Sequence, residues 1–283
     1  MTIKKNIVLN KKGSKSILVD LLYNSNNNKM PVIIFCHGYK GYKDWGAWNL
    51  VAKEFANNNF FFLKFNFSHN GGTTENPIDF PDLNAFGNNN FTHELNDIER
   101  VLSFLSDNTE FSKNIDLKNV FLIGHSRGGG ICAIKASENK QIKGLITWAG
   151  VSNFKIRFNE GSKEFKEWKD KGVKYVENKR TKQQMPHFFQ FYLDFKKNEE
   201  RFNIKTAVKN LKIPFLVVHG ENDHSVLPYE GNDLNSWAKY SEFFSVKNGN
   251  HTFSSKHPWQ EKELPKELKV VTKITMSFIN KCV

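Results

Sequence analysis

The stretch FLIGHSRGGG, residues 121–130, decides the fold and directs the search for a function. Apolar residues typical of a buried strand lead into GHSRG, residues 124–128, which matches the pattern G-x-S-x-G, and a helical pattern follows. A strand that turns directly into a helix strains the residue at the turn, so the neighbours two positions away must be small. An ordinary glycine-rich turn fits the stretch as well, whereas a P-loop is excluded because the spacing G-x-x-x-x-G-K-[ST] is absent. Ser126 is therefore a candidate nucleophile.

Apolar runs of strand length alternate with segments of helical periodicity on both sides of this turn. A hairpin is predicted over 6–9 and 16–23; further strands are predicted over 31–36, 60–67, 120–123, 144–149, 214–219 and 242–246, and helices over 45–57, 92–105, 131–137 and 266–280. This order is typical of the α/β class, with a mostly parallel central sheet flanked by helices. A chain of 283 residues fits a single domain, 1–283.

One segment interrupts the alternation. Residues 151–210 lie between two predicted strands and mix Lys and Glu with many aromatic residues. Connections of this length are uncommon unless they contain helices of their own or act as a lid. We therefore predict a small, mostly helical cap insertion over 151–210, whose aromatic side chains form a small core or line a substrate pocket.

An activated serine needs a base, and the base needs an acid to orient it. Asp223, in HGENDHSV, follows an apolar strand and is expected at the same edge of the sheet as Ser126, with Glu221 and His224 as its nearest rivals. His251, in GNHTF, follows the last predicted strand. The order Ser, Asp, His along the chain makes these three residues a candidate catalytic triad.

The attack of a serine on a carbonyl builds negative charge on oxygen, which requires hydrogen-bond donors already aimed at that point. The sequence HGYKG, residues 37–41, directly follows an apolar strand, and Arg127 directly follows the candidate nucleophile. The backbone N–H groups of Tyr39 and Arg127 are therefore the expected oxyanion-hole donors.

Taken together, HGYKG, GHSRGG, HGENDHSV and GNHTF resemble motifs of the α/β-hydrolase superfamily, and within it of the dienelactone-hydrolase-like and feruloyl (cinnamoyl) esterase-like serine hydrolases. The resemblance covers nearly the whole chain and implies the α/β-hydrolase fold. It also implies that Ser126 is the nucleophile, Asp223 the acid and His251 the base. The serine departs from dienelactone hydrolases proper, in which cysteine is usual.

The resemblance implies a small-molecule carboxylic ester as substrate, cleaved through an acyl-enzyme intermediate without a cofactor. Two alternatives stay open: a serine amidase, exopeptidase-like or acyltransferase activity on the same fold, and a non-enzymatic binding protein on a hydrolase scaffold. His69 lies in a loop that often borders the acyl pocket of such hydrolases, and Trp148 lies at the end of a predicted strand. Both are candidates for substrate contacts.

Composition narrows the class of partner. The formal net charge is +12, but the lysines are dispersed and no nucleic-acid motif is present. This pattern indicates a solvated surface, with weak attraction of anions left open.

Three cysteines are too few for a disulfide framework and fit a reducing compartment. No segment has the length of a membrane span, the N-terminus lacks the apolar region of a signal peptide, and no cluster has metal-ligand spacing. We expect a cytoplasmic enzyme, with a removed signal peptide and a homo-oligomer both left open.

Overall fold

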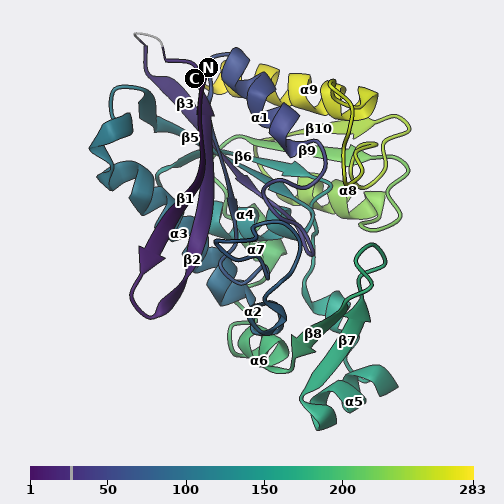
Figure 1. Ribbon diagram of the computed structural model, residues 1–283. Helices are drawn as coiled ribbons and strands as arrows, with labels where there is room; N and C mark the ends of the chain where they lie inside the picture. Colours follow the sequence, from purple (N-terminus) through teal and green to yellow (C-terminus); the bar gives the residue numbers. More distant parts are fainter. Residues whose placement is uncertain (26–27) are drawn as a thin grey trace.

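An eight-stranded sheet forms the centre of the computed structural model, which describes residues 1–25 and 28–283 (Figure 1). Its strands in chain order are β1 (Thr2–Lys11), β2 (Ser14–Tyr23), β3 (Met30–Cys36), β4 (Phe61–Asn66), β5 (Ile115–His125), β6 (Ile142–Trp148), β9 (Phe215–Gly220) and β10 (Ser241–Val246). Across the sheet the order is β1-β2-β4-β3-β5-β6-β9-β10. Within this sheet, as far as the structure describes it, the β1–β2 and β2–β4 pairs are antiparallel and the remaining pairs are parallel. The predicted hairpin and mostly parallel sheet are confirmed.

Helices cover both faces of the sheet, because the strands are apolar on both faces. In β3, for example, Val32 and Ile34 belong to one hydrophobic core, while Ile33 and Phe35 belong to the other. One face is covered by α1 (Trp48–Asn57) and α9 (Lys266–Cys282), and the other by α3 (Phe91–Asp107), α4 (Arg127–Glu138) and α8 (Pro228–Trp237). Within the described residues, none of the helices combines the length and hydropathy that a membrane span requires.

Several helices differ from the sequence prediction; α4 begins at Arg127 and not at residue 131, and α2 (Leu83–Gly87) was not predicted. The helix predicted from residue 45 begins at Trp48, because the turn before it is closed by a hydrogen bond from the Trp48 amide to the Trp45 carbonyl at 3.3 Å. The sequence pattern does not indicate α8 at all. Leu234 is the one large apolar side chain of α8 that is buried, so the helix has no apolar stripe that its sequence could reveal.

The 151–210 insertion contains a 3-10 turn (Lys155–Phe158), α5 (Lys163–Lys171), α6 (Gln190–Lys197), α7 (Ile204–Lys209) and an antiparallel hairpin of β7 (Val173–Glu177) and β8 (Gln184–Phe188). The helices agree with the prediction, whereas the hairpin was not expected. In Figure 1 this hairpin and α5 stand apart from the central sheet, while α2 (Leu83–Gly87) lies beside β8. Buried aromatic side chains, namely Phe158, Trp168 and Phe195, form part of the core under the insertion.

A buried network of four charged side chains joins β2, β4 and the loop that follows β3. Lys64 Nζ lies 2.6 Å from both Asp20 Oδ2 and Asp44 Oδ1, and Lys43 Nζ lies 2.8 Å from Asp20 Oδ1. Each of the four side chains has two partners of opposite charge, so the loss of one leaves an uncompensated charge in a medium of low dielectric. The network therefore anchors the chain directly after HGYKG, residues 37–41, to the sheet.

Candidate active site

Ser126 lies at a strained turn between β5 and α4. Its backbone angles are φ 57° and ψ −121°, in a region that non-glycine residues rarely adopt. A Cβ atom on Gly124 would stand 2.4 Å from the Gly128 carbonyl oxygen, and one on Gly128 would stand 2.4 Å from the Cys36 carbonyl oxygen. The two glycines of G-x-S-x-G are thus required by close backbone approach, and together they hold the Ser126 side chain at the carboxyl end of the sheet.

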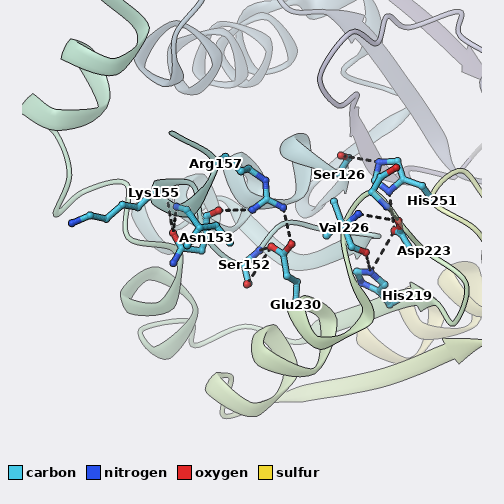
Figure 2. Close-up of polar contacts among 12 residues, drawn as sticks. Ser126, Ser152, Asn153, Lys155, Arg157, His219, Asp223, Val226, Glu230 and His251 are labelled. Carbon is cyan, nitrogen blue, oxygen red and sulfur yellow. Dashed lines mark hydrogen bonds and ion pairs between the residues drawn. The ribbon is translucent and has the colours of Figure 1, made fainter. Parts of the chain in front are cut away.

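A continuous chain of hydrogen bonds joins Ser126, His251 and Asp223 (Figure 2). His251 Nε2 lies 3.0 Å from Ser126 Oγ, and His251 Nδ1 lies 2.8 Å from Asp223 Oδ2. Of the two rivals of Asp223, Glu221 accepts a hydrogen bond from Ser245 and His224 is exposed. The three residues proposed from the sequence are therefore the ones that the fold brings into contact.

Asp223 is held as an ionised acceptor. Its Oδ1 accepts hydrogen bonds from the amides of Ser225 and Val226 at 2.8 and 2.9 Å. Burial opposes the ionisation of Asp223, but its contacts with His219 and His251 outweigh that effect and hold the pKa of the carboxyl well below its ordinary range. An ionised Asp223 favours a proton on His251 Nδ1, which leaves Nε2 free to accept the proton of the Ser126 hydroxyl.

Two buried histidines, His125 and His37, form hydrogen bonds with the backbone of the segments that carry the site. His125 is buried, and its Nε2 lies 2.8 Å from the His251 carbonyl oxygen. Burial and the proximity of His251 lower the pKa of His125 to about 3, so the ring is neutral and donates its Nε2–H to that carbonyl. His37 is bound to backbone in the same manner, with Nδ1 2.9 Å from the Gly38 carbonyl oxygen and Nε2 accepting from the Phe67 amide at 3.2 Å. Both histidines therefore hold backbone near the ends of their strands.

The segment HGYKG, residues 37–41, lies against the serine. Gly38 packs on Ser126, and Tyr39 and Arg127 line the same cavity as Ser126. Arg127 is the first residue of α4, and the first amides of a helix have no partner within the helix. The side chains of Tyr39 and Arg127 are also in contact, because the Arg127 guanidinium lies 4.6 Å from the centroid of the Tyr39 ring.

A cavity of about 520 Å³ opens above Ser126 and His251. Its walls come from the sheet edge and from the 151–210 insertion, which contributes Phe158 and Trp168 from its aromatic core, and Arg157, Lys174, Val176, His187 and Phe191. The sequence left open whether the aromatic side chains of this insertion form a small core or line a pocket, and it did not identify which of them reach the pocket. No sequence pattern indicated that Arg157 and Lys174 of the insertion would line the cavity.

The two candidates for substrate contacts lie elsewhere, which corrects both expectations. Trp148 is fully buried between the sheet and the α1/α9 layer, where its Nε1 donates to Thr275 Oγ1 at 3.0 Å. His69 lines a different cavity of about 1290 Å³, between the β1–β2 hairpin and α3, and stacks on His93 with ring centroids 4.0 Å apart. The direction of a side chain at a strand end depends on register, which the sequence pattern does not resolve at these positions.

The comparison with known families agrees with this arrangement. A family model described as BD-FAE matches residues 19–238. The chain belongs to the BD-FAE family. Its fold and its relatives confirm the expected resemblance to α/β hydrolases of the feruloyl-esterase-like and dienelactone-hydrolase-like groups.

Solved structures similar to this BD-FAE family member show the same α/β-hydrolase fold. Est1E from Butyrivibrio proteoclasticus has a TM-score of 0.73 at 15% identity, with 99% of both chains covered. Est1E with ferulic acid bound has a TM-score of 0.75 at 16% identity, covering 97% of this chain and 98% of that chain. The esterase domain of a Rhodothermus marinus protein has a TM-score of 0.68 at 17% identity, with 99% of both chains covered. No curated protein sequence matches the chain significantly.

Proposed function

We propose that this BD-FAE family member is a serine esterase that hydrolyses carboxylic esters through an acyl-enzyme intermediate. The observation that carries the proposal is the hydrogen-bonded chain from Asp223 through His251 to Ser126, with separations of 2.8 and 3.0 Å. A nucleophile, a base and an orienting acid within hydrogen-bonding distance are the arrangement that activates a serine.

The reaction follows from this geometry. His251 Nε2 removes the proton of Ser126 as Oγ attacks the ester carbonyl, and the Tyr39 and Arg127 amides stabilise the negative charge on the carbonyl oxygen. The protonated His251, paired with Asp223, then gives its proton to the departing alcohol, which leaves an acyl group on Ser126. A water molecule activated by the same histidine hydrolyses the acyl-enzyme and restores the serine.

We infer that the 151–210 insertion acts as a cap that shapes the substrate pocket within a single domain. Aromatic rings from the cap and from α3 line the cavity above Ser126, including Phe91, Phe158, Trp168 and Phe191. Such a lining suits an aryl or other apolar group of the ester. The ferulic acid bound to Est1E, a protein of similar fold, supports an aryl group.

The three cysteines support a cytoplasmic location. Cys36, Cys132 and Cys282 are all free thiols, and the first two are buried. Unpaired cysteines suit a reducing compartment.

A fluorophosphonate probe and p-nitrophenyl acetate test the proposed activity together. The wild-type protein is expected to be labelled at Ser126 and to release p-nitrophenol with an initial burst, and the Ser126→Ala variant is expected to lose both. Ser236→Ala, which alters an exposed serine of α8, serves as the matched control. Unchanged turnover in Ser126→Ala would contradict the proposal, and faster cleavage of p-nitroacetanilide than of the ester would indicate an amidase instead.

A further inference from the structure

The charges that line the cavity above Ser126 are of one sign. Among the described residues, its lining includes Lys40, Arg127, Arg157 and Lys174, but no Asp or Glu. The carboxylate of Asp223 lies behind His251 and does not line the cavity. A substrate in this pocket therefore meets cationic side chains without an acidic residue on the wall to balance them.

The two arginines are already neutralised by buried carboxylates. Arg127 Nη1 lies 3.1 Å from Glu94 Oε1, and Arg157 Nη2 lies 2.7 Å from Glu230 Oε1 (Figure 2 shows the second pair). Both glutamates are buried. These pairs hold the guanidinium groups in place, so the arginines shape the wall and add little net charge.

The two lysines have no such partner. In the part of the chain that the structure describes, neither Lys40 nor Lys174 forms an ion pair. Lys174 Nζ lies 3.9 Å from the centroid of the Trp168 ring, and Lys40 Nζ lies 5.2 Å from that of the Tyr39 ring. An aromatic ring attracts an ammonium group but does not compensate its charge as a carboxylate does.

Lys40 and Lys174 flank one hydrogen-bonded pair that bridges the sheet edge and the cap. Tyr39, the neighbour of Lys40, binds His187 Nε2 through its hydroxyl at 2.7 Å, and His187 is the cross-strand partner of Lys174 in the β7–β8 hairpin. Burial, together with the nearby charges of Arg127, Lys174 and Lys40, lowers the pKa of His187 to about 3. Burial also lowers the pKa of each lysine, as expected for ammonium groups that lack a counter-charge.

We propose that the part of the ester lying under the cap carries an anionic oxygen group, a carboxylate or a phosphate, which Lys40 and Lys174 bind. The inference rests on the proposed esterase function and specifies its substrate class. An anion at this point supplies the counter-charge that the two lysines lack, while the aromatic rings of the wall contact the body of the substrate.

A pair of isosteric esters tests the proposal. The ratio of kcat/KM for 4-acetoxybenzoate to that for the neutral 4-acetoxybenzamide is measured in the wild-type protein and in the Lys40→Gln/Lys174→Gln variant. We expect the ratio to fall about tenfold, the loss typical of two partly exposed ion pairs. Because the same two esters are used with both proteins, the difference in reactivity between their leaving groups cancels when the two ratios are compared. Lys171→Gln removes one charge from the exposed face of the same cap and is expected to leave the ratio unchanged.

The outcome that overturns the proposal is a ratio in the double variant equal to that of the wild-type protein. The single variants Lys40→Gln and Lys174→Gln give the same comparison if the double variant does not fold. A third ester, 4-acetoxyphenyl phosphate, separates the two anions, because a higher kcat/KM than for the benzoate indicates a phosphate as the natural group.

A binding measurement on a catalytically inactive variant tests the anion site independently of the esterase activity. Equilibrium dialysis of 4-acetoxybenzoate and 4-acetoxybenzamide against Ser126→Ala protein is expected to show tighter binding of the anion, and the Lys40→Gln/Lys174→Gln changes are expected to remove that difference. Absence of turnover of every ester by the wild-type protein would contradict the esterase, whereas equal binding of both compounds would contradict the anion site alone.

Discussion

Gly38 lies so close to Ser126 that a Cβ atom on Gly38 would stand 2.8 Å from Ser126 Cβ and 3.3 Å from Ser126 Oγ. Tyr39, whose amide is a proposed oxyanion donor, is the next residue along the chain. The approach of Gly38 to Ser126 therefore holds the segment that carries the Tyr39 amide against the serine. Any side chain at position 38 must displace the segment that carries the amide.

The variant Gly38→Ala is expected to lower kcat for p-nitrophenyl acetate about 10²- to 10³-fold, the loss typical of removing one oxyanion donor. Steady-state kinetics measure the effect. Gly13→Ala is the control for backbone strain alone: Gly13 has φ 76°, so the variant is expected to lose stability, but the hairpin is remote from the site and kcat is expected to stay unchanged. Wild-type kcat in Gly38→Ala would show that the Tyr39 amide does not act on the transition state.

The variant Asp223→Asn is expected to lower kcat about 10⁴-fold, because an amide can donate to His251 Nδ1 and so favour the wrong tautomer. Glu221→Gln changes the neighbouring acid, whose contact is Ser245, and should leave kcat unaltered. An equal loss in both variants would mean that the effect comes from the loop and not from the contact with His251. Fluorophosphonate labelling rates provide a second readout.

Acid destabilisation through His125 follows from its lowered pKa. The folded His125 has a pKa of about 3, whereas an unfolded histidine titrates near 6.5, so the unfolded chain binds the proton first as the pH falls. No penalty exists above pH ~6.5, and stability decreases below it by about 1.4 kcal/mol per pH unit, or about 2 kcal/mol by pH 5.

The variant His125→Gln keeps a donor for the His251 carbonyl but removes this titration. Its free energy of unfolding in urea should therefore decline less steeply between pH 6.5 and pH 5 than that of the wild-type protein. His224→Gln, at an exposed position, should retain the wild-type slope. Identical slopes for His125→Gln and the wild-type protein would contradict the assignment of a neutral, buried His125.

Breaking the buried charge network should destabilise the protein strongly. Lys64→Met leaves Asp20 and Asp44 without one of their partners and is expected to cost about 3–5 kcal/mol in the free energy of unfolding, measured in urea. Lys171→Met removes an exposed lysine paired with Glu167 and should cost far less. Comparable losses in the two variants would show that burial of the network does not matter.

Local sequence was sufficient for the strands of the central sheet, for most of the helices that cover it and for the strained turn. The apolar run before GHSRG and the glycines on both sides of Ser126 form a local signature of the turn. In the structure, a Cβ atom on Gly124 would stand 2.4 Å from the Gly128 carbonyl oxygen, whereas one on Gly128 would stand 2.4 Å from the carbonyl oxygen of Cys36 on β3. The acid and the base were also predictable, because parallel strands bring their carboxyl ends to one edge and the loops after them carry Asp223 and His251.

The sequence by itself thus determined the α/β class, the turn at Ser126 and the three residues that meet there. Tertiary packing alone decided that Trp148 faces the core, that His69 lines another cavity and that a hairpin within the insertion carries Lys174 to the pocket. The physical reason is that a hydrophobic period and a turn motif depend on adjacent residues. The wall of a pocket depends on side chains from segments far apart in the chain, and their direction is set by register and by the packing of whole elements.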